Sequence, residues 1–245
     1  MSADWVSASA PPRLTTGHIH LWRFRVDADV EDPAVLLQLL TKEEQAKAAG
    51  FGTRTLASQF VVNRASLRRL LSLYVHEVPT EICFDYGPHG KPALKVPDPK
   101  VGFNLTHSGP LSLLAIQRHP DIGVDVERTS RCVDYSRVAR RFFAVDEFDY
   151  LHSLPEEQRH QAFFECWTRK EAYLKARGQG VAGGLDRFSV SFGPNRPSLL
   201  LRTADDTKPS GWVIQSLSPW AETAAAVCAP APEQELVRLQ WSPHI

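Results

Sequence analysis

The sequence lacks an excess of charge of either sign. Lys and Arg together number 28, Asp and Glu also number 28, and the formal net charge is therefore zero. A chain without a net electrostatic field is not drawn as a whole to nucleic acid or to an acidic membrane surface. We therefore expect neither among its partners, and any anion that it binds must meet a local group of basic side chains.

Cysteine is also scarce. The four cysteines, Cys83, Cys132, Cys166 and Cys228, are far apart in the chain, and none forms the C-x-x-C spacing of a soft-metal site. The first residues do not have the pattern of a signal peptide. We interpret the cysteines as reduced core thiols and predict a cytoplasmic protein.

Long hydrophobic runs are missing as well. The longest, such as Leu111 to Ile116 and Ala224 to Ala229, are far shorter than the roughly 18–20 residues that span a bilayer. What the chain does have is an ordinary globular composition over 245 residues, with 43% apolar and 23% charged residues. This composition predicts a soluble protein of one or two domains with a sizeable core.

Helical and extended patterns alternate along the chain. Apolar residues with helical spacing predict two helices over 33–40 and 42–77, and three more over 134–141, 146–154 and 156–177. Short apolar runs bounded by turn residues predict strands at 19–26, 82–86, 102–106, 111–117, 122–127, 188–192, 198–202, 211–217 and 223–229. This order favours an α+β fold, with a loose arm at 1–17, an N-terminal subdomain at 18–118 and a C-terminal subdomain at 119–245.

The predicted strand at 122–127 carries two acidic residues on one face. Because its residues alternate strictly, Ile122, Val124 and Val126 face one side, while Asp125 and Glu127 face the other. Two such carboxylates can converge on a hard cation such as Mg²⁺. The alternative is the solvated acidic face of an edge strand.

A third carboxylate lies in the apolar face of the predicted helix at 161–177. At 100° per residue, Glu171 falls within the apolar arc that is formed by Phe163, Leu174, Trp167 and Phe164. A buried carboxylate normally needs a cation, which here is either a metal or a lysine. The alternative is a common i,i+4 pair of Glu171 with Lys175.

The segment Phe103 to Gly109 combines a strand with a polar turn. Thr106, His107 and Ser108 place a hydroxyl, an imidazole and another hydroxyl in a row. Such groups at the end of a strand can bind phosphate without a net basic charge. The alternative is that His107 is a structural histidine.

Five ordered segments together resemble the 4′-phosphopantetheinyl transferases, in the long two-subdomain form of the surfactin-synthetase-activating type. The segments are GKPAL at 90–94, FNLTHSG at 103–109, IGVDVE at 122–127, RFFAVDE at 141–147 and WTRKEAYLKARGQG at 167–180. The resemblance covers about residues 50–192. It implies two similar α/β subdomains in a pseudo-twofold arrangement, with an active site at their junction, and a monomer.

The resemblance also implies the reaction. Members of this family transfer the 4′-phosphopantetheine arm of CoA to a serine hydroxyl of an apo acyl- or peptidyl-carrier protein, with Mg²⁺, and release adenosine 3′,5′-bisphosphate. In this sequence Asp125, Glu127 and Glu171 match the metal-binding acids, and Lys175 would face the diphosphate. Lys91, Thr106 and His107 match residues near the CoA nucleotide and its phosphates.

Some positions depart from the family pattern or leave a choice. Ala144 stands where Ser or Thr often caps the next helix, so we expect a slightly weaker helix start. Arg54 and Arg64 are the basic candidates for the 3′-phosphate, since Gln59 occupies the place where arginine is expected. The proton acceptor is Glu171, a water that it holds, or Glu147.

Carrier docking and two other functions complete the expectations. Phe142, Phe143, Phe148 and Tyr150, which lie among Arg140, Arg141 and His152 in the sequence, are the residues predicted to anchor an acidic carrier protein. The alternative functions are a Mg²⁺-dependent phosphohydrolase and a non-catalytic module that binds CoA or a carrier. The residues do not distinguish which carriers are served.

Overall fold

The chain folds into two compact units. A computed structural model describes residues 5–27, 32–95, 101–180, 184–203 and 211–242. One unit comprises residues 1–85, 92–120 and 236–245, and the other comprises 86–91 and 121–235. Both combine helices with strands, as the sequence predicts, and the mixed α/β architecture is confirmed.

The first unit is built on a five-stranded sheet. Its strands, in spatial order, are β1 (Val6–Ser7), β12 (Glu235–Gln240), β2 (His18–Arg25), β6 (Leu111–Gln117) and β5 (Gly102–Ser108). β6 pairs antiparallel with both β2 and β5, and β1 pairs parallel with β12. A short hairpin, β3 (Phe84–Tyr86) and β4 (Pro92–Leu94), follows the 3-10 turn at Pro79–Glu81.

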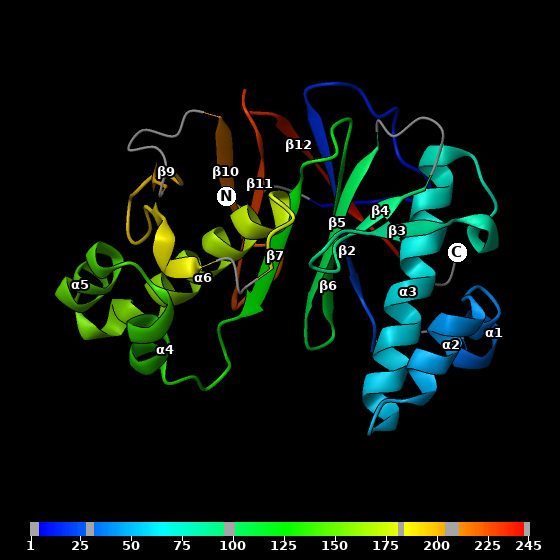
Figure 1. The fold of residues 1–245 in the computed structure, drawn as a ribbon, viewed down its shortest axis with the longest axis horizontal. Coiled ribbons are helices and arrows are strands. Elements are labelled where there is room, and N and C mark those ends of the chain that lie inside the picture. Colours follow the sequence, from blue (N-terminus) through cyan, green and yellow to red (C-terminus); the bar gives the residue numbers. More distant parts are fainter. Residues whose placement is uncertain (1–4, 28–31, 96–100, 181–183, 204–210, 243–245) are drawn as a thin grey trace. The chain divides into compact units, whose positions relative to one another are not determined.

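The unit has three helices in this part of the chain, which corrects the prediction of a single helix over 42–77. They are α1 (Pro33–Leu37), α2 (Lys42–Ala49) and α3 (Arg54–Val75), of which α1 and α2 pack on α3. α2 ends at Gly50, and Thr53 begins α3 by accepting a hydrogen bond from the Leu56 amide at 3.3 Å, an N-cap that a helical period alone does not reveal. α3 runs along the sheet (Figure 1), and its residues Leu67 and Leu70 are buried in the same core as Trp22.

The second unit packs one long helix on a three-stranded sheet. β7 (Gly123–Arg128), β11 (Thr223–Pro230) and β10 (Trp212–Leu217) pair antiparallel in the order β10-β11-β7. α6 (Glu156–Ala176) lies beside this sheet, and α4 (Tyr135–Phe142) and α5 (Val145–Ser153) lie on the other side of α6 (Figure 1). A 3-10 turn at Leu185–Arg187 and the small sheet of β8 (Ser189–Val190) and β9 (Leu200–Arg202) complete the unit.

α6 approaches β7 most closely at Gly123. A Cβ atom at this position would lie 2.0 Å from the carbonyl oxygen of Ala172 and 2.3 Å from the amide nitrogen of Ala176. Only glycine leaves the room for the helix backbone at this separation. The acidic residues of β7 and the polar residues at the end of α6 are therefore held close to each other.

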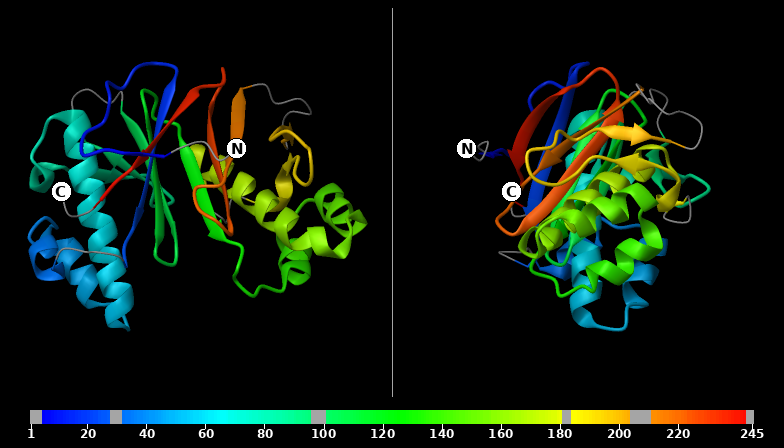
Figure 2. Two further views of the ribbon diagram at one scale, coloured as in Figure 1. Left: turned by 180° about the vertical axis from the view of Figure 1, so that it is seen from behind. Right: turned by 90° about the vertical axis from the view of Figure 1, so that its left-hand side faces the viewer.

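Two segments at the ends of the chain differ from the expectation. Residues 6–7, within the predicted arm at 1–17, form β1, and residues 235–240, for which we predicted no strand, form β12. Both belong to the sheet of the first unit, with β12 (red) beside β2 (blue) in Figure 2, although the sequence assigns 119–245 to the C-terminal subdomain. The partners of β12 are more than 200 residues away in the sequence, so no local pattern indicates the pairing.

Among the residues that the structure describes, no helix is both long and apolar enough to cross a membrane.

Candidate active site

The two acidic residues of β7 are positioned as the alternation of the sequence predicts. Val124 and Val126 are buried in the core, while Asp125 and Glu127 project from the opposite face of the strand. Asp125 is itself only 5% exposed and Glu127 is partly exposed. This burial of Asp125 is unlike the solvated acidic face that was the alternative.

Each of these acids contacts a basic side chain. The Lys175 ammonium lies 2.5 Å from Asp125 Oδ1 and also donates to the carbonyl oxygen of Val124 at 3.3 Å. Arg131 Nη1 lies 2.8 Å from Glu127 Oε2. Lys175 thus extends from α6 to β7, besides its electrostatic effect on Glu171 in its own helix.

Glu171 is the third carboxylate and has an incompletely satisfied environment. Its residue exposure is 7%, and its Oε1 atom has no hydrogen-bond partner. Burial, and next the negative charge of Asp125, raise the pKa of Glu171 to about 7, with the positive charge of Lys175 opposing and Glu127 adding a smaller effect. The three acids therefore share one electrostatic environment, and the buried Oε1 atom lacks a cation or a proton donor.

The donor set suits a hard divalent cation. Three carboxylates on two adjacent elements provide oxygen ligands of the kind that Mg²⁺ prefers, and the orphaned Glu171 oxygen fits such an ion. Within the described part of the chain, no group of three or more His, Cys, Asp or Glu side chains is gathered closely enough to hold a metal ion. In this structure the positive charge beside Asp125 is Lys175.

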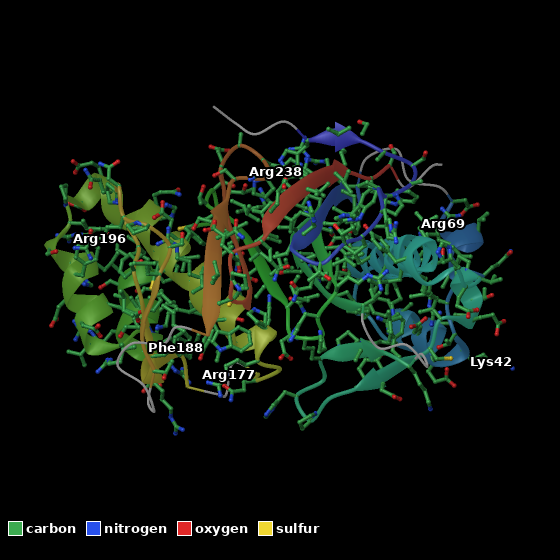
Figure 3. All side chains as sticks on the ribbon, turned by 90° about the horizontal axis from the view of Figure 1, so that it is seen from above. Lys42, Arg69, Arg177, Phe188, Arg196 and Arg238 are labelled. Atoms are coloured by element: carbon green, nitrogen blue, oxygen red, sulfur yellow. The ribbon has the colours of Figure 1, made fainter. Side chains whose placement is uncertain are left out.

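Lys91 lies in the loop between β3 and β4 and contacts the same two elements. Its ammonium donates to the carbonyl oxygen of Ile122, just before β7, at 2.9 Å, and to that of Ala176, the last residue of α6, at 3.2 Å. Burial lowers the pKa of Lys91. Both bonds are to the backbone, so here Lys91 links the ends of β7 and α6. Arg177, labelled in Figure 3, directly follows this end of α6.

The structure does not bring Thr106 and His107 together on one face. Both lie in β5, where Thr106 is buried and His107 is exposed, because successive side chains of a strand point to opposite sides. Ser108 is buried on the side of Thr106. The Thr106 and His107 side chains therefore lie on opposite faces of β5.

The two arginine candidates of α3 have different surroundings. Arg64 Nε lies 2.5 Å from Glu44 Oε1, and its guanidinium lies 4.4 Å from the centre of the Phe84 ring. Arg54 is the first residue of α3 and is exposed. Arg64 is thus engaged in a partly buried ion pair within the first unit.

Glu147 is surrounded by structural partners. Its carboxylate accepts hydrogen bonds from Lys170 Nζ at 2.6 Å and from the backbone amides of Ala144 and Val190 at 2.8 Å each. The bond from Ala144 caps α5, where the alanine side chain supplies no cap, as expected. These contacts assign Glu147 to the joining of α5, α6 and β8.

Lys170 is a buried residue whose role the sequence analysis missed. It is fully buried, donates to Glu147 and to the carbonyl oxygen of Phe188 at 2.6 Å, and lies 4.2 Å from the centre of the Phe188 ring. Phe188 is labelled in Figure 3. The available signal was the position of Lys170 at the border of the apolar helix face, which a solvated lysine also occupies.

Comparison with known proteins agrees with these observations. Residues 121–229 match the sequence model of the 4′-phosphopantetheinyl transferase superfamily. The 4′-phosphopantetheinyl transferase HetI of a Nostoc species is 36% identical over 221 residues, 89% of this chain and 90% of the relative. The transferase psf-1 of Bacillus pumilus is 30% identical over 77% of this chain and 79% of its own, and Sfp of Bacillus subtilis is 28% identical over 65% and 70%.

The extent of these matches shows the family, because the first relative is aligned along nearly its whole length. The chain belongs to the 4′-phosphopantetheinyl transferase superfamily. It is a transferase of the class that uses CoA and a divalent metal.

Proposed function

We propose that this protein transfers the 4′-phosphopantetheine arm of CoA to a serine hydroxyl of an apo acyl- or peptidyl-carrier protein, with Mg²⁺ as the metal. The observation that carries the proposal is the electrostatic effect of Asp125 and Glu127 on Glu171 across β7 and α6, together with Lys175 beside Asp125 and one buried Glu171 oxygen without a hydrogen-bond partner. Its family membership supports the same reaction.

The proposed chemistry is a substitution at phosphorus. The serine oxygen forms a bond to the phosphorus that carries pantetheine, and the bond from that phosphorus to the bridging oxygen breaks. Adenosine 3′,5′-bisphosphate leaves with the electron pair, and the serine proton passes to a carboxylate or a water. Charge on the phosphoryl oxygens and on the leaving group limits such a reaction.

Residues of this chain provide for that charge. Asp125, Glu127 and Glu171 would hold Mg²⁺, which supplies positive charge to the phosphoryl oxygens when it is bound. Lys175 has an ammonium group beside these acids and would neutralise the diphosphate. We assign the proton acceptor to Glu171 or a water that it holds, because both Glu147 oxygens already accept hydrogen bonds.

We further propose that Lys91, His107, Thr106 and one of Arg54 and Arg64 contact the nucleotide part of CoA. The exposure of His107 supports a ligand contact. His107→Ala should raise the KM for CoA much more than the KM for dephospho-CoA, which lacks the 3′-phosphate. Equal increases for the two substrates would remove His107 from the 3′-phosphate.

We propose the end of α4 and the start of α5 as the carrier-docking surface. Arg140 and Arg141 are exposed, and their guanidinium groups lie 5.3 and 5.1 Å from the ring centres of Phe148 and Phe142. The neighbouring Val145 is 77% exposed. Phe143, one of the aromatic residues predicted to anchor the carrier, is buried in the core and does not belong to this surface.

Reversing the charge of an exposed arginine tests the docking proposal. Carrier proteins of this kind are acidic helical bundles, so Arg140→Glu should raise the KM for the carrier and weaken its dependence on salt. The KM for CoA should stay unchanged. An unchanged carrier KM would place the docking surface elsewhere.

The deciding experiment is incubation with CoA, Mg²⁺ and an apo carrier protein, followed by intact-mass measurement. The transferase adds one phosphopantetheine group to the carrier. A phosphohydrolase would consume CoA and leave the carrier mass unchanged, and a binding module would change neither. The pseudo-twofold relation, the junction site, the monomeric state and the cytoplasmic location remain predictions, as do the domain boundaries.

A further inference from the structure

The two acidic residues of β7 form ion pairs with basic side chains that differ in their exposure to water. The side chains of Lys175 and Asp125 are 28% and 6% exposed, whereas the side chain of Arg131, which pairs with Glu127, is 53% exposed. Water and salt screen an exposed pair more strongly than a buried one. The Lys175–Asp125 pair is therefore the stronger of the two.

A metal ion that uses these carboxylates meets Lys175 as a competitor. Asp125 Oδ1 is already 2.5 Å from the lysine ammonium, and a divalent cation and an ammonium repel each other at one carboxylate. Glu171 Oε1 and the other carboxylate oxygen of Asp125, Oδ2, are both buried without a hydrogen-bond partner. The site thus combines two buried oxygens that suit a cation with an ammonium group that already lies on Asp125 Oδ1.

We infer that Lys175 has two partners in turn: Asp125 in the protein without ligands, and the diphosphate of CoA once metal and CoA are bound. The inference rests on the proposed function, since that function supplies the diphosphate. Metal alone is repelled by the ammonium that lies on Asp125 Oδ1, whereas metal with CoA provides the ammonium with a new anionic partner. Metal and CoA therefore bind with positive coupling, and Lys175 carries this coupling.

The test measures Mn²⁺ binding directly, by the electron paramagnetic resonance of free Mn²⁺ and by calorimetry. Without CoA, Lys175→Met should bind Mn²⁺ about fivefold or more tightly than the natural protein, the lower end of ordinary coupling between sites. CoA should then tighten Mn²⁺ binding in the natural protein and much less in Lys175→Met. Lys175→Arg keeps the charge and should bind Mn²⁺ alone as weakly as the natural protein.

Two controls separate Lys175 from a general effect of charge. Lys42→Met changes the net charge equally at an exposed position at the start of α2 and should leave Mn²⁺ binding unchanged. Arg131→Met removes the exposed partner of Glu127 and should have a smaller effect than Lys175→Met. Equal effects from Arg131→Met and Lys175→Met would overturn the assignment to Lys175.

Unchanged or weaker Mn²⁺ binding by folded Lys175→Met, in the absence of CoA, would also overturn the inference. If that variant does not fold, the natural protein alone decides, because independent binding of Mn²⁺ and CoA contradicts the coupling. None of these measurements uses a carrier protein. Failure of the proposed function appears separately, as an unmodified apo carrier with the natural protein.

Discussion

Glu171 is a carboxylate that the fold holds at a cost in stability when no metal is present. Burial and the charges of Asp125 and Glu127 raise its pKa to about 7, so its ionised form is disfavoured in the folded state. The folded protein holds the proton of the Glu171 carboxyl group more tightly than the unfolded chain does. The contribution of Glu171 to the free energy of unfolding therefore falls as pH rises from about 4.5 to 7.

Replacement of Glu171 by glutamine should therefore separate stability from activity. Without metal, Glu171→Gln should melt at the same or a higher temperature than the natural protein, and the gain should be largest at pH 7 and above. Carrier modification should fall by about 100-fold or more, as for loss of a main electrostatic or acid–base group. Thermal melting and intact-mass kinetics measure the two effects.

Glu157→Gln is the matched control, since Glu157 is an exposed residue of the first turn of the same helix. Glu157→Gln should change neither the melting temperature nor the rate of carrier modification. Near-normal carrier modification by Glu171→Gln, with a small loss of stability, would show that Glu171 is only a helix partner of Lys175.

We expect a second pH dependence from His20, which lies far from Asp125, Glu127 and Glu171 in the sequence. It is buried, and its Nδ1 atom lies 2.8 Å from the Tyr74 hydroxyl, which also accepts a hydrogen bond from Trp22 at 2.7 Å. The Tyr74 proton is therefore available to His20, which stays neutral. Burial, and next the charge of His18, lower the pKa of His20 to about 4.

The unfolded chain binds this proton near pH 6.5, so the contribution of His20 is present above pH 6.5 and is lost as pH falls toward 4. The expected slope is at most about 1.4 kcal/mol per pH unit for one proton. His20→Gln should flatten this part of the curve of unfolding free energy against pH. Tyr74→Phe leaves His20 in place and should therefore still show a slope between about pH 4 and 6.5. An unchanged slope in His20→Gln would assign the proton elsewhere.

At the scale of elements, the contact of α6 with β7 decides the geometry of the acids. Gly123→Ala places a Cβ atom 2.0 Å from the Ala172 carbonyl, so the backbone of the helix or the strand must move. Overpacking of this kind typically costs about 1–3 kcal/mol and here also separates Glu171 from Asp125. We expect a lower melting temperature and reduced Mn²⁺ binding.

Gly211→Ala is the control for this substitution, because a Cβ atom at Gly211 meets nothing within 4 Å. Its melting temperature and Mn²⁺ binding should match those of the natural protein. If Gly123→Ala behaves in the same way, the close packing of α6 on β7 does not position the acids.

The elements show what the sequence could and could not reveal. The period-two pattern of β7 places Asp125 on the face opposite Val124, and the 100° period of α6 places Glu171 among apolar residues; both are local properties, and both are seen in the structure. The partners Lys175–Asp125 and Lys170–Glu147 join different elements. Such pairs depend on tertiary packing, which spacing within one element does not encode.

At the scale of the whole molecule, the last strand is a structural part of the first unit. Trp241 follows β12, is buried, and packs edge-on against Trp22 of β2 with ring centres 6.1 Å apart. Trp241→Ala should cost about 3–5 kcal/mol of unfolding free energy, as for other buried aromatic residues. Denaturant unfolding measures the loss.

Trp5→Ala is the comparison, since Trp5 is only partly buried and lies against the Arg23 guanidinium, 4.9 Å from its ring centre. It should cost much less than Trp241→Ala. Equal losses for the two variants would mean that the buried Trp241 contributes no more to the stability of the first unit than the partly buried Trp5.

The position of β12 also has a consequence for synthesis on the ribosome. β12 lies between β1 and β2 in the sheet, yet its residues are translated after residues 121–234. Domains tend to fold as units while the chain emerges, so the second unit has all its residues before the first does. The unit whose translation begins first is thus the unit that is completed last, and until then the edge of β2 that pairs with β12 stays open.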